Sequence, residues 1–248
     1  MNLLKSSRAF AAALTTLISV LATSIATPVS AGADNTIPRD VLEGIEAMRR
    51  LPVDGFHIVE SQGRLLLVST NGHYVVSGGR IIDLWNQIEV KSVADVDGTT
   101  RIPLARMGIE AAALGGIVAG QAKEQQRVTA FLDPSSPESR KLLPYLRDVG
   151  KTYRLEIVFV PAQPSRAGIS RALICDPKAA MTFIEQGTVP APVSDANGCG
   201  RKELERARVT VALLGIEALP FTVAPNGATV AGTPKNFAEF VASNREAQ

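Results

Sequence analysis

Cysteine, histidine and aromatic residues are scarce in this chain of 248 residues. It contains two cysteines, two histidines and one tryptophan, and aromatic residues make up 5% of it. Two cysteines exclude a dense disulfide scaffold, and so few Cys and His residues exclude a zinc-ribbon protein. An excess of one charge is also absent, because the chain after position 31 carries 24 basic and 24 acidic residues. This balance gives no electrostatic footprint for nucleic acid or for an anionic membrane surface. Apolar residues make up 46%, enough for a sizeable core at this length.

The first 31 residues have the pattern of a secretion signal. Lys5 and Arg8 precede an uncharged stretch over residues 9–26, and Val29 and Ala31 occupy the −3 and −1 positions of a cleavage site. We predict cleavage after Ala31 and export to a compartment that favours disulfide formation. The alternative is an uncleaved signal anchor, since about 18 apolar residues just span a bilayer. Five Ser and Thr residues within the stretch weaken that alternative.

Residues 38–90 have the pattern of a small module. A helix is expected from Pro38, with apolar residues at spacings of three and four, and Pro52 is expected to end it. Strands are then expected from Phe56, Arg64 and His73, and the last two are separated by Asn71-Gly72, which is a hairpin signal. A sheet of this size buries little surface by itself. We therefore expect residues 38–90 to pair with a second copy of the chain.

The rest of the chain alternates between strand and helix patterns. Residues 91–126 are expected to form a linker, largely helical and interrupted near Gly115-Gly116, and residues 127–248 a second domain. Its expected elements are strands at 127–133 and 154–162, helices at 139–149, 178–186, 201–214 and 237–244, and a hairpin over 220–232. Thr233 is expected as N-cap of the last helix, with Pro234 at its first position. This order is that of a thioredoxin fold with a helical insertion, so the fold class is α+β or α/β.

The whole chain after the signal resembles the periplasmic disulfide isomerase family DsbC/DsbG. The segment GRLLLVSTNGHYVVSGGRIIDLWN, residues 63–86, is similar to the strands and turns of that family's N-terminal dimerisation module. The resemblance implies a periplasmic homodimer joined through residues 38–90, with a cleft that holds misfolded protein clients. It implies no cofactor and no metal.

The family's C-x-x-C motif falls on Ser136-Pro137-Glu138-Ser139. In the family, the helix N-terminus after the first strand stabilises a thiolate at the first position. A serine hydroxyl cannot form a disulfide, so exchange chemistry through Ser136 and Ser139 is excluded. An activated serine nucleophile needs a nearby base, and His57 and His73 lie in the other module. We interpret Ser136 as a helix N-cap with Pro137 at the first helical position.

Cys175 and Cys199 match the pair that the family keeps as a structural disulfide. Two cysteines without a nearby histidine make a poor metal site. Asp176 and Pro177 have the pattern of an N-cap and a first helical residue, which places Cys175 at a helix entrance. A redox role for this pair therefore stays open as an alternative.

Leu219-Pro220 falls where the family has a cis-proline that faces the start of the active-site helix. The resemblance implies a cis bond there and a substrate-binding role for Leu219, Pro220 and Phe221. The alternative is a turn that only maintains the fold. Three functional hypotheses follow: a redox-inactive binding or chaperone protein, an oxidoreductase or isomerase that uses Cys175 and Cys199, and an assembly factor of an envelope secretion or conjugation machine.

Overall fold

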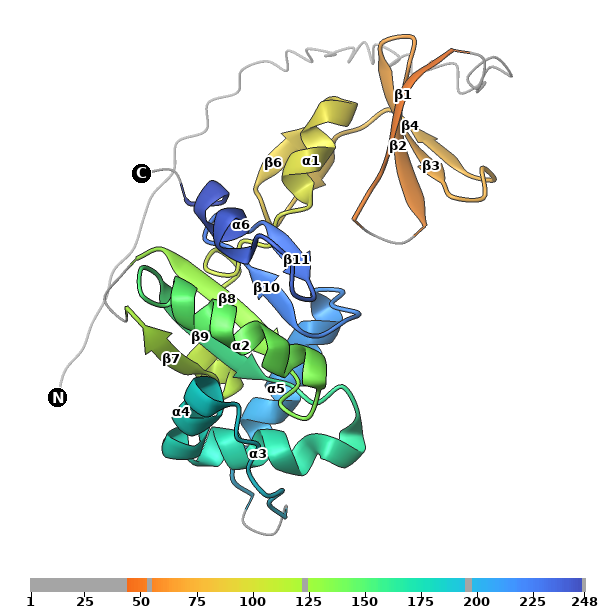
Figure 1. Ribbon diagram of the computed structural model, residues 1–248. Helices are drawn as coiled ribbons and strands as arrows, with labels where there is room; N and C mark the ends of the chain where they lie inside the picture. The colour runs from red at the N-terminus through yellow and green to blue at the C-terminus, as the bar shows by residue number, and fades with distance from the viewer. Residues whose placement is uncertain (1–43, 53–54, 122–124, 195–197, 247–248) are drawn as a thin grey trace, which may run out of the picture. The chain divides into compact units, whose positions relative to one another are not determined.

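The computed structural model describes residues 44–52, 55–121, 125–194 and 198–246 (Figure 1). The expected signal and its cleavage site at Ala31 lie outside the described residues. Within the described ranges, no helix is both long and apolar enough to cross a membrane.

The N-terminal module contains a four-stranded antiparallel sheet in chain order. Its strands are β1 (Ile45–Arg50), β2 (Phe56–Ser61), β3 (Arg64–Ser69) and β4 (Val75–Ser77). The turn between β3 and β4 contains the Asn71-Gly72 pair that predicted it. The Asn71 side-chain oxygen accepts hydrogen bonds from the Ser69 hydroxyl and the His73 backbone N–H, and Gly72 has a φ of 68°. Such a positive φ suits glycine, so this hairpin is determined locally.

The helix expected from Pro38 to Leu51 is wrong for its described part. Residues 45–50 form β1 and pair antiparallel with residues 57–61 of β2. Ile45 and Met48 have helical spacing, but both side chains are exposed, so their spacing does not mark a buried helix face. Pairing along the edge of β2 satisfies the backbone of this segment and outweighs its local helical pattern.

A hairpin and two short helical turns follow the sheet. They are β5 (Ile81–Asp83), β6 (Ile88–Val90), η2 (Val93–Asp95) and α1 (Val96–Thr99). Ile58 of β2 packs with Val90, Val93 and Val96 in one buried cluster. At the start of η2, the backbone N–H of Lys91 and the hydroxyl and backbone N–H of Ser92 donate to the Asp95 carboxylate. These hydrogen bonds, that of the Lys91 N–H first, lower the pKa of Asp95 below its ordinary value.

The C-terminal domain is built on a five-stranded sheet in the order β11-β10-β8-β9-β7. The strands are β7 (Ile117–Gly120), β8 (Arg127–Leu132), β9 (Arg154–Phe159), β10 (Phe221–Val223) and β11 (Thr229–Ala231). Strands β8 and β9 are parallel and joined by α2 (Pro137–Val149), while β10 is antiparallel to both β8 and β11. Helices α3 (Ala167–Cys175), α4 (Pro177–Gln186) and α5 (Arg201–Leu213) lie between β9 and β10, and α6 (Phe237–Ser243) ends the domain. This is a thioredoxin fold with a helical insertion.

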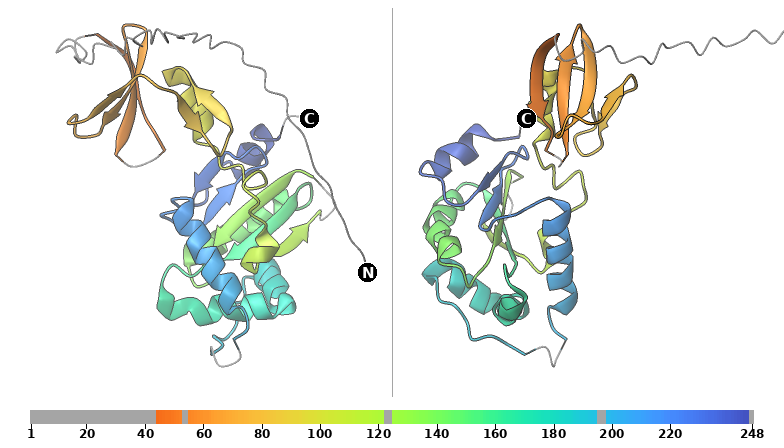
Figure 2. Two further views of the ribbon diagram at one scale, coloured as in Figure 1. Left: turned by 180° about the vertical axis from the view of Figure 1, so that it is seen from behind. Right: turned by 90° about the vertical axis from the view of Figure 1, so that its right-hand side faces the viewer.

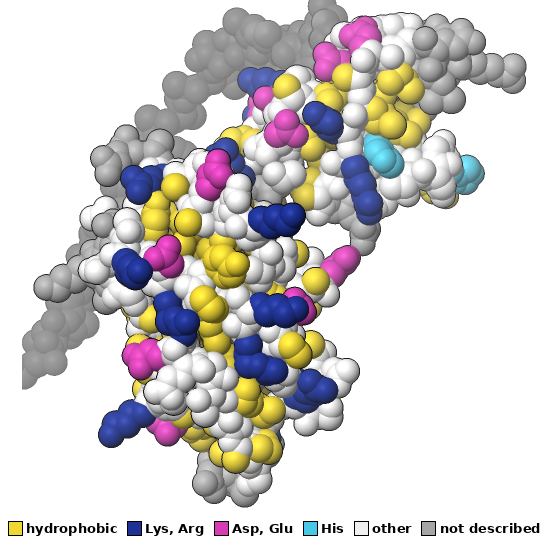
Figure 3. Space-filling model, viewed as in Figure 1, with side chains coloured by type: hydrophobic (Ala, Val, Ile, Leu, Met, Phe, Trp, Pro, Cys, Tyr) yellow, Lys and Arg dark blue, Asp and Glu magenta, His cyan; other side chains and the backbone are white. Residues whose placement is uncertain are grey.

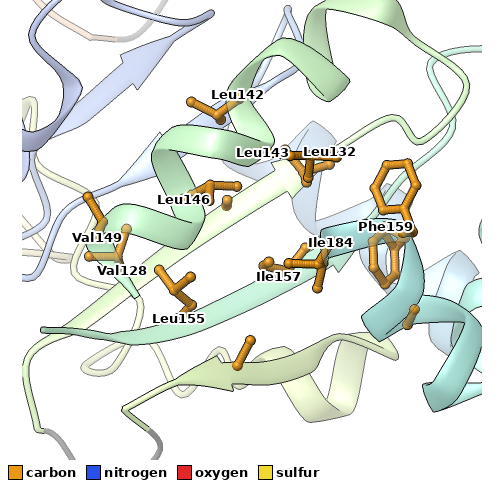
Figure 4. Close-up of a cluster of buried hydrophobic side chains, with 14 of the residues drawn as sticks. Val128, Leu132, Leu142, Leu143, Leu146, Val149, Leu155, Ile157, Phe159 and Ile184 are labelled. Atoms are coloured by element: carbon orange, nitrogen blue, oxygen red, sulfur yellow. The ribbon is translucent and has the colours of Figure 1, made fainter. Parts of the chain in front are cut away.

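Alternate residues of β8 and β9 enter two different cores, as the two-residue period of a strand requires. Val128, Leu132 and Ile157 face α2, where Leu142, Leu143 and Leu146 cover them (Figure 4). Phe131, Val158 and Val160 belong to a second cluster on the other side of the sheet, together with Ala207 of α5 and Leu114. The sheet is therefore covered on both faces, by α2 and α6 on one and by α5 on the other (Figure 2).

The segment expected to be a helical linker differs from that expectation. Between residues 101 and 121 the helical structure is one short turn, η3 (Ala111–Leu114), and residues 117–120 form β7 at the edge of the sheet. Gly115 ends the turn with a φ of 70°, and a Cβ on Gly116 would lie 2.8 Å from the Ile157 carbonyl oxygen. The two glycines therefore allow the chain to approach β9, so the sheet includes residues before the expected boundary at 127.

The helical insertion and the last helix each differ in one detail from what the sequence predicted. Helix α3 was not expected; Gly168 lies in its first turn and no side chain caps its start, so its local signal is weak. The last helix begins after Asn236, so Thr233 is not its N-cap. The expected strands at 127–133 and 154–162, the helix at 139–149 and the hairpin over 220–232 are all present.

Candidate functional site

Three segments that are distant in sequence meet at one end of the C-terminal sheet. Strands β8 and β9 are parallel, so the residues after Leu132 and Phe159 leave the sheet at the same end. Strand β10 is antiparallel to β8 and Phe221 pairs with Phe131, so the residues before β10 lie at this end too. The topology thus gathers residues 133–139, 160–166 and 219–221, which include the predicted positions Ser136, Ser139 and Leu219–Phe221.

Ser136 is the N-cap of α2, as predicted. Its backbone is extended, its hydroxyl oxygen accepts a hydrogen bond from the Glu138 N–H at 3.2 Å, and Pro137 occupies the first helical position. Glu138 lies in the first turn, where the helix dipole favours a carboxylate, and forms a 2.7 Å ion pair with Lys141. The hydroxyl of Ser136 therefore caps the helix.

Ser139 has a different role, because its side chain is fully buried. Its hydroxyl oxygen accepts a hydrogen bond from the backbone N–H of Asp133 at 3.1 Å. This bond ties the first turn of α2 to the end of β8 and satisfies a buried donor. Both motif positions therefore have a structural role. The Ser136 hydroxyl caps α2, and the buried Ser139 hydroxyl joins the first turn of α2 to the end of β8.

Asp133 holds the loop together and was not singled out from the sequence. One carboxylate oxygen accepts from the Ser135 N–H at 2.8 Å and the Ser135 hydroxyl at 2.6 Å, and the other accepts from the Ala162 N–H at 3.1 Å. The side chain is buried, and these three donors offset the cost of removing a carboxylate from water. Asp-Pro-Ser-Ser is a turn-forming sequence, which is the signal that marks this residue.

Two arginines complete the loop. Arg140 donates to the carbonyl oxygens of Pro134 and Ser135, and Arg166 donates to the Ser135 hydroxyl at 3.2 Å. Arg166 belongs to the segment that follows β9, so this contact joins two of the three converging segments.

The third segment carries a cis peptide bond between Leu219 and Pro220, as the resemblance implied. Pro220 is buried and its carbonyl oxygen accepts a hydrogen bond from the Gly232 N–H at 2.8 Å. Leu219 and Phe221 are each half-buried, with part of each side chain packed on the cluster beneath α5. The end of the sheet therefore combines a capped helix start with a partly exposed apolar segment.

The two cysteines lie in the helical insertion and are bonded to each other. Cys175 is the last residue of α3, and Cys199 directly precedes Gly200, the N-cap of α5; their Cα atoms are 6.0 Å apart. The predicted disulfide is therefore present. Asp176 caps α4, its carboxylate accepting from the Lys178 N–H, as expected. Cys199 is exposed and Cys175 is half-buried.

The arrangement at residues 133–139 cannot exchange disulfides, because it contains no sulfur. His57 lies in β2 and His73 just before β4, both in the N-terminal sheet, so neither belongs to the segments that form this site. Charges of both signs are interspersed on the face seen in Figure 3. Among the described residues, no three His, Cys, Asp or Glu side chains are grouped as metal ligands.

No protein-family model matches the chain, and no curated protein matches it. Solved structures do resemble it. A disulfide interchange protein from Neisseria gonorrhoeae is 18% identical, with a TM-score of 0.45 over 54% of this chain and 99% of its own. Proteus mirabilis ScsC in a compact conformation is 14% identical, with a TM-score of 0.43 over 64% and 82%. Helicobacter pylori DsbG is 16% identical, with a TM-score of 0.34 over 72% and 92%.

Two of these three neighbours are a disulfide interchange protein and a DsbG by name. At identities under 25% and TM-scores under 0.5, the likenesses carry no argument about activity. The thioredoxin fold rests on the strand order and register of this chain.

Proposed function

We propose that the protein is exported to the periplasm and binds client proteins at the end of its thioredoxin-fold sheet without thiol–disulfide exchange. The observation that carries this proposal is the state of the two motif positions. The Ser136 hydroxyl caps α2, and the Ser139 hydroxyl accepts a hydrogen bond from the Asp133 N–H. Both positions therefore carry an oxygen with a structural role, where disulfide exchange requires a sulfur. Export is supported by the signal-like first 31 residues and by the disulfide in the insertion.

Client binding needs only an accessible apolar surface and free backbone groups. Leu219 and Phe221 supply apolar surface beside the cis bond. The resemblance to DsbC/DsbG implies that Leu219 stands where that family has a small or hydroxylated residue. An extended client segment would place its own apolar side chains there and hydrogen-bond to the backbone at Leu219. The occupant we propose is an unfolded polypeptide.

Two assays on the same preparation test this proposal. Insulin reduction measures exchange, and the wild-type chain is expected to show no turnover above buffer. Ser136→Cys/Ser139→Cys is expected to gain turnover, because the strand, the helix start and the cis bond are in place around both positions. Substantial wild-type turnover would refute the redox-inactive assignment.

The second assay is suppression of aggregation of a denatured client. Leu219→Ser is expected to weaken the protection, because it removes apolar surface from the proposed contact. Met181→Ser, on α4 and similarly part-exposed, is the matched control and is expected to leave protection unchanged. Absent protection by the wild type, or equal losses in the two variants, would remove the chaperone assignment and favour the dedicated assembly factor.

We propose further that the chain forms a homodimer through its N-terminal module. Tyr74, Val76, Ile82 and Leu84 are large apolar side chains at least half exposed there, and Leu84 is 80% exposed. Exposed apolar side chains of this size on a small module favour burial against a second copy. Light scattering at micromolar concentration is expected to give the dimer mass, and a monomer would contradict the proposal.

The oxidoreductase hypothesis for Cys175 and Cys199 retains one supporting observation, the exposure of Cys199. Thiol titration separates it from the structural disulfide. The native protein is expected to bind no thiol reagent without reductant, whereas two equivalents bound would favour a redox-active pair.

A further inference from the structure

Helix α5 presents one exposed face along its length. Lys202, Arg206, Val209 and Leu213 follow one another at spacings of four, three and four residues, so they share a face. All four are exposed, and Val209 and Leu213 are 59% and 61% exposed. The first half of the face is basic and the second half is apolar. Figure 2 shows α5 on the outside of the domain, across the sheet from α2 and α6.

A groove of about 700 Å³ runs beside this face. Ile109, Ala113 and Leu114 line it from the segment before β7, and Val209 lines it from α5, with Lys202 and Arg206 from the preceding turns. The exposed apolar atoms of Val209 are therefore continuous with those of a second segment. Scattered apolar side chains are normal on a protein surface, but a groove lined from two segments offers a shaped docking surface.

The charges of the groove are unbalanced. Its two acidic residues already have partners outside it: Glu110 lies 3.9 Å from Arg127, and Glu205 lies 3.6 Å from Arg208. The side chains of Lys202 and Arg206 make no hydrogen bond or ion pair with any residue in the described ranges. The groove therefore offers two cations without side-chain partners next to apolar surface, which is complementary to carboxylates at one end of a ligand and apolar groups at the other.

We propose that this groove docks an acidic amphipathic helix of a partner protein. From Lys202 to Leu213 the face extends about 16 Å at 1.5 Å per residue, which matches three turns of a second helix. Leucine-like side chains would enter beside Val209 and Ile109, and glutamates one or two turns away would pair with Lys202 and Arg206. The surface lies apart from Leu219 and does not depend on the proposed client site.

The test uses two fluorescent alanine-based helical peptides of about 15 residues. The acidic probe carries two glutamates on one face of its first two turns and two leucines on the same face of its last two turns. The basic probe has lysines in place of the glutamates. Each is also made with reversed sequence, so that both helix directions are sampled. Fluorescence anisotropy with the full chain gives the dissociation constants.

The acidic probe is expected to bind the wild type about two- to thirtyfold more tightly than the basic probe, from two exposed ion pairs. Lys202→Glu/Arg206→Glu is expected to reverse this preference. Lys151→Glu/Lys235→Glu changes the net charge equally at exposed positions next to α2 and α6, on the other face of the sheet from α5, and is expected to leave the preference unchanged. Val209→Ser/Leu213→Ser is expected to weaken the acidic probe about tenfold or more, because apolar burial is lost.

Three results would overturn the proposal: equal binding of both probes, equal losses in the two charge-reversal variants, or no binding of either peptide at millimolar concentration. Sodium laurate is tested as an additional ligand, beside the acidic and basic peptides. If laurate binds and is lost in Lys202→Glu/Arg206→Glu while both peptides fail, the groove takes an anionic amphiphile and the helix proposal is wrong. Aggregation suppression measured on the same variants reports on the client site separately.

Discussion

Removal of the Cys175–Cys199 disulfide is expected to destabilise the C-terminal domain by about 3 kcal/mol. The bond closes a loop with a sequence separation of 24. In the chain-entropy treatment, closing a loop of that length lowers the entropy of the unfolded chain by about 11.6 cal/mol/K, which is about 3.4 kcal/mol at 25 °C. The urea dependence of unfolding for domains of this size is about 1–3 kcal/mol per molar, so the unfolding midpoint should fall by about 1–3 M.

The assay is urea unfolding of Cys175→Ser/Cys199→Ser, followed by the helical circular dichroism signal. Helices α2 to α6 all belong to the C-terminal domain, so this signal reports mainly on that domain. The wild type with dithiothreitol is the matched control, because it lacks the crosslink and keeps both side chains.

If the entropic reasoning is right, the reduced wild type and the double variant unfold at the same lower urea concentration, and dithiothreitol has no effect on the variant. An unchanged midpoint in both would refute the reasoning. A loss in the variant alone would assign the destabilisation to side-chain packing instead of loop closure.

Three further predictions concern local hydrogen bonds. Ser136→Ala should cost about 1 kcal/mol through loss of the cap of α2, while Ser136→Asp should retain most of it; melting temperatures compare the two. Ser139→Ala should cost about 1–3 kcal/mol, because the buried Asp133 N–H loses its acceptor, and equal stability of Ser139→Ala and wild type in urea would contradict this. Since the folded-state pKa of Asp95 lies below its unfolded value, its stabilisation is present above the unfolded pKa and is lost as the pH falls through the folded pKa. Asp95→Asn should remove that part of the acid dependence, measured as unfolding midpoints from neutral pH downward.

The sequence predicted the elements whose signals are local. Ser136-Pro137 marked the start of α2, and Asn71-Gly72 marked the turn before β4, because each depends on side chains and backbone angles within a few residues. The strand patterns over 127–133 and 154–162 predicted two strands, and side chains of both enter the cores on either side of the sheet.

Elements that depend on distant partners were not predicted. Residues 45–50 have helical spacing, yet they form β1 because β2 offers a backbone partner. Residues 117–120 form β7 because Gly116 lets the chain lie against β9, about forty residues further along the chain. Asp133 has a local signal in its turn-forming sequence, but its contact with the Ala162 N–H, on the segment after β9, depends on the tertiary structure.

The sequence by itself determined that residues 136 and 139 carry hydroxyls and that the only two thiols of the chain are Cys175 and Cys199. Disulfide exchange at the motif is excluded by that composition alone, because the chemistry belongs to the sulfur atom. Only the tertiary structure decided what the two hydroxyls do. The Ser136 hydroxyl accepts from the Glu138 N–H and the Ser139 hydroxyl from the Asp133 N–H, and both bonds depend on where those N–H groups lie. Likewise, basic and apolar residues of α5 line a groove only because the segment before β7 packs beside them. Neighbours in space are set by packing, which local sequence patterns do not record.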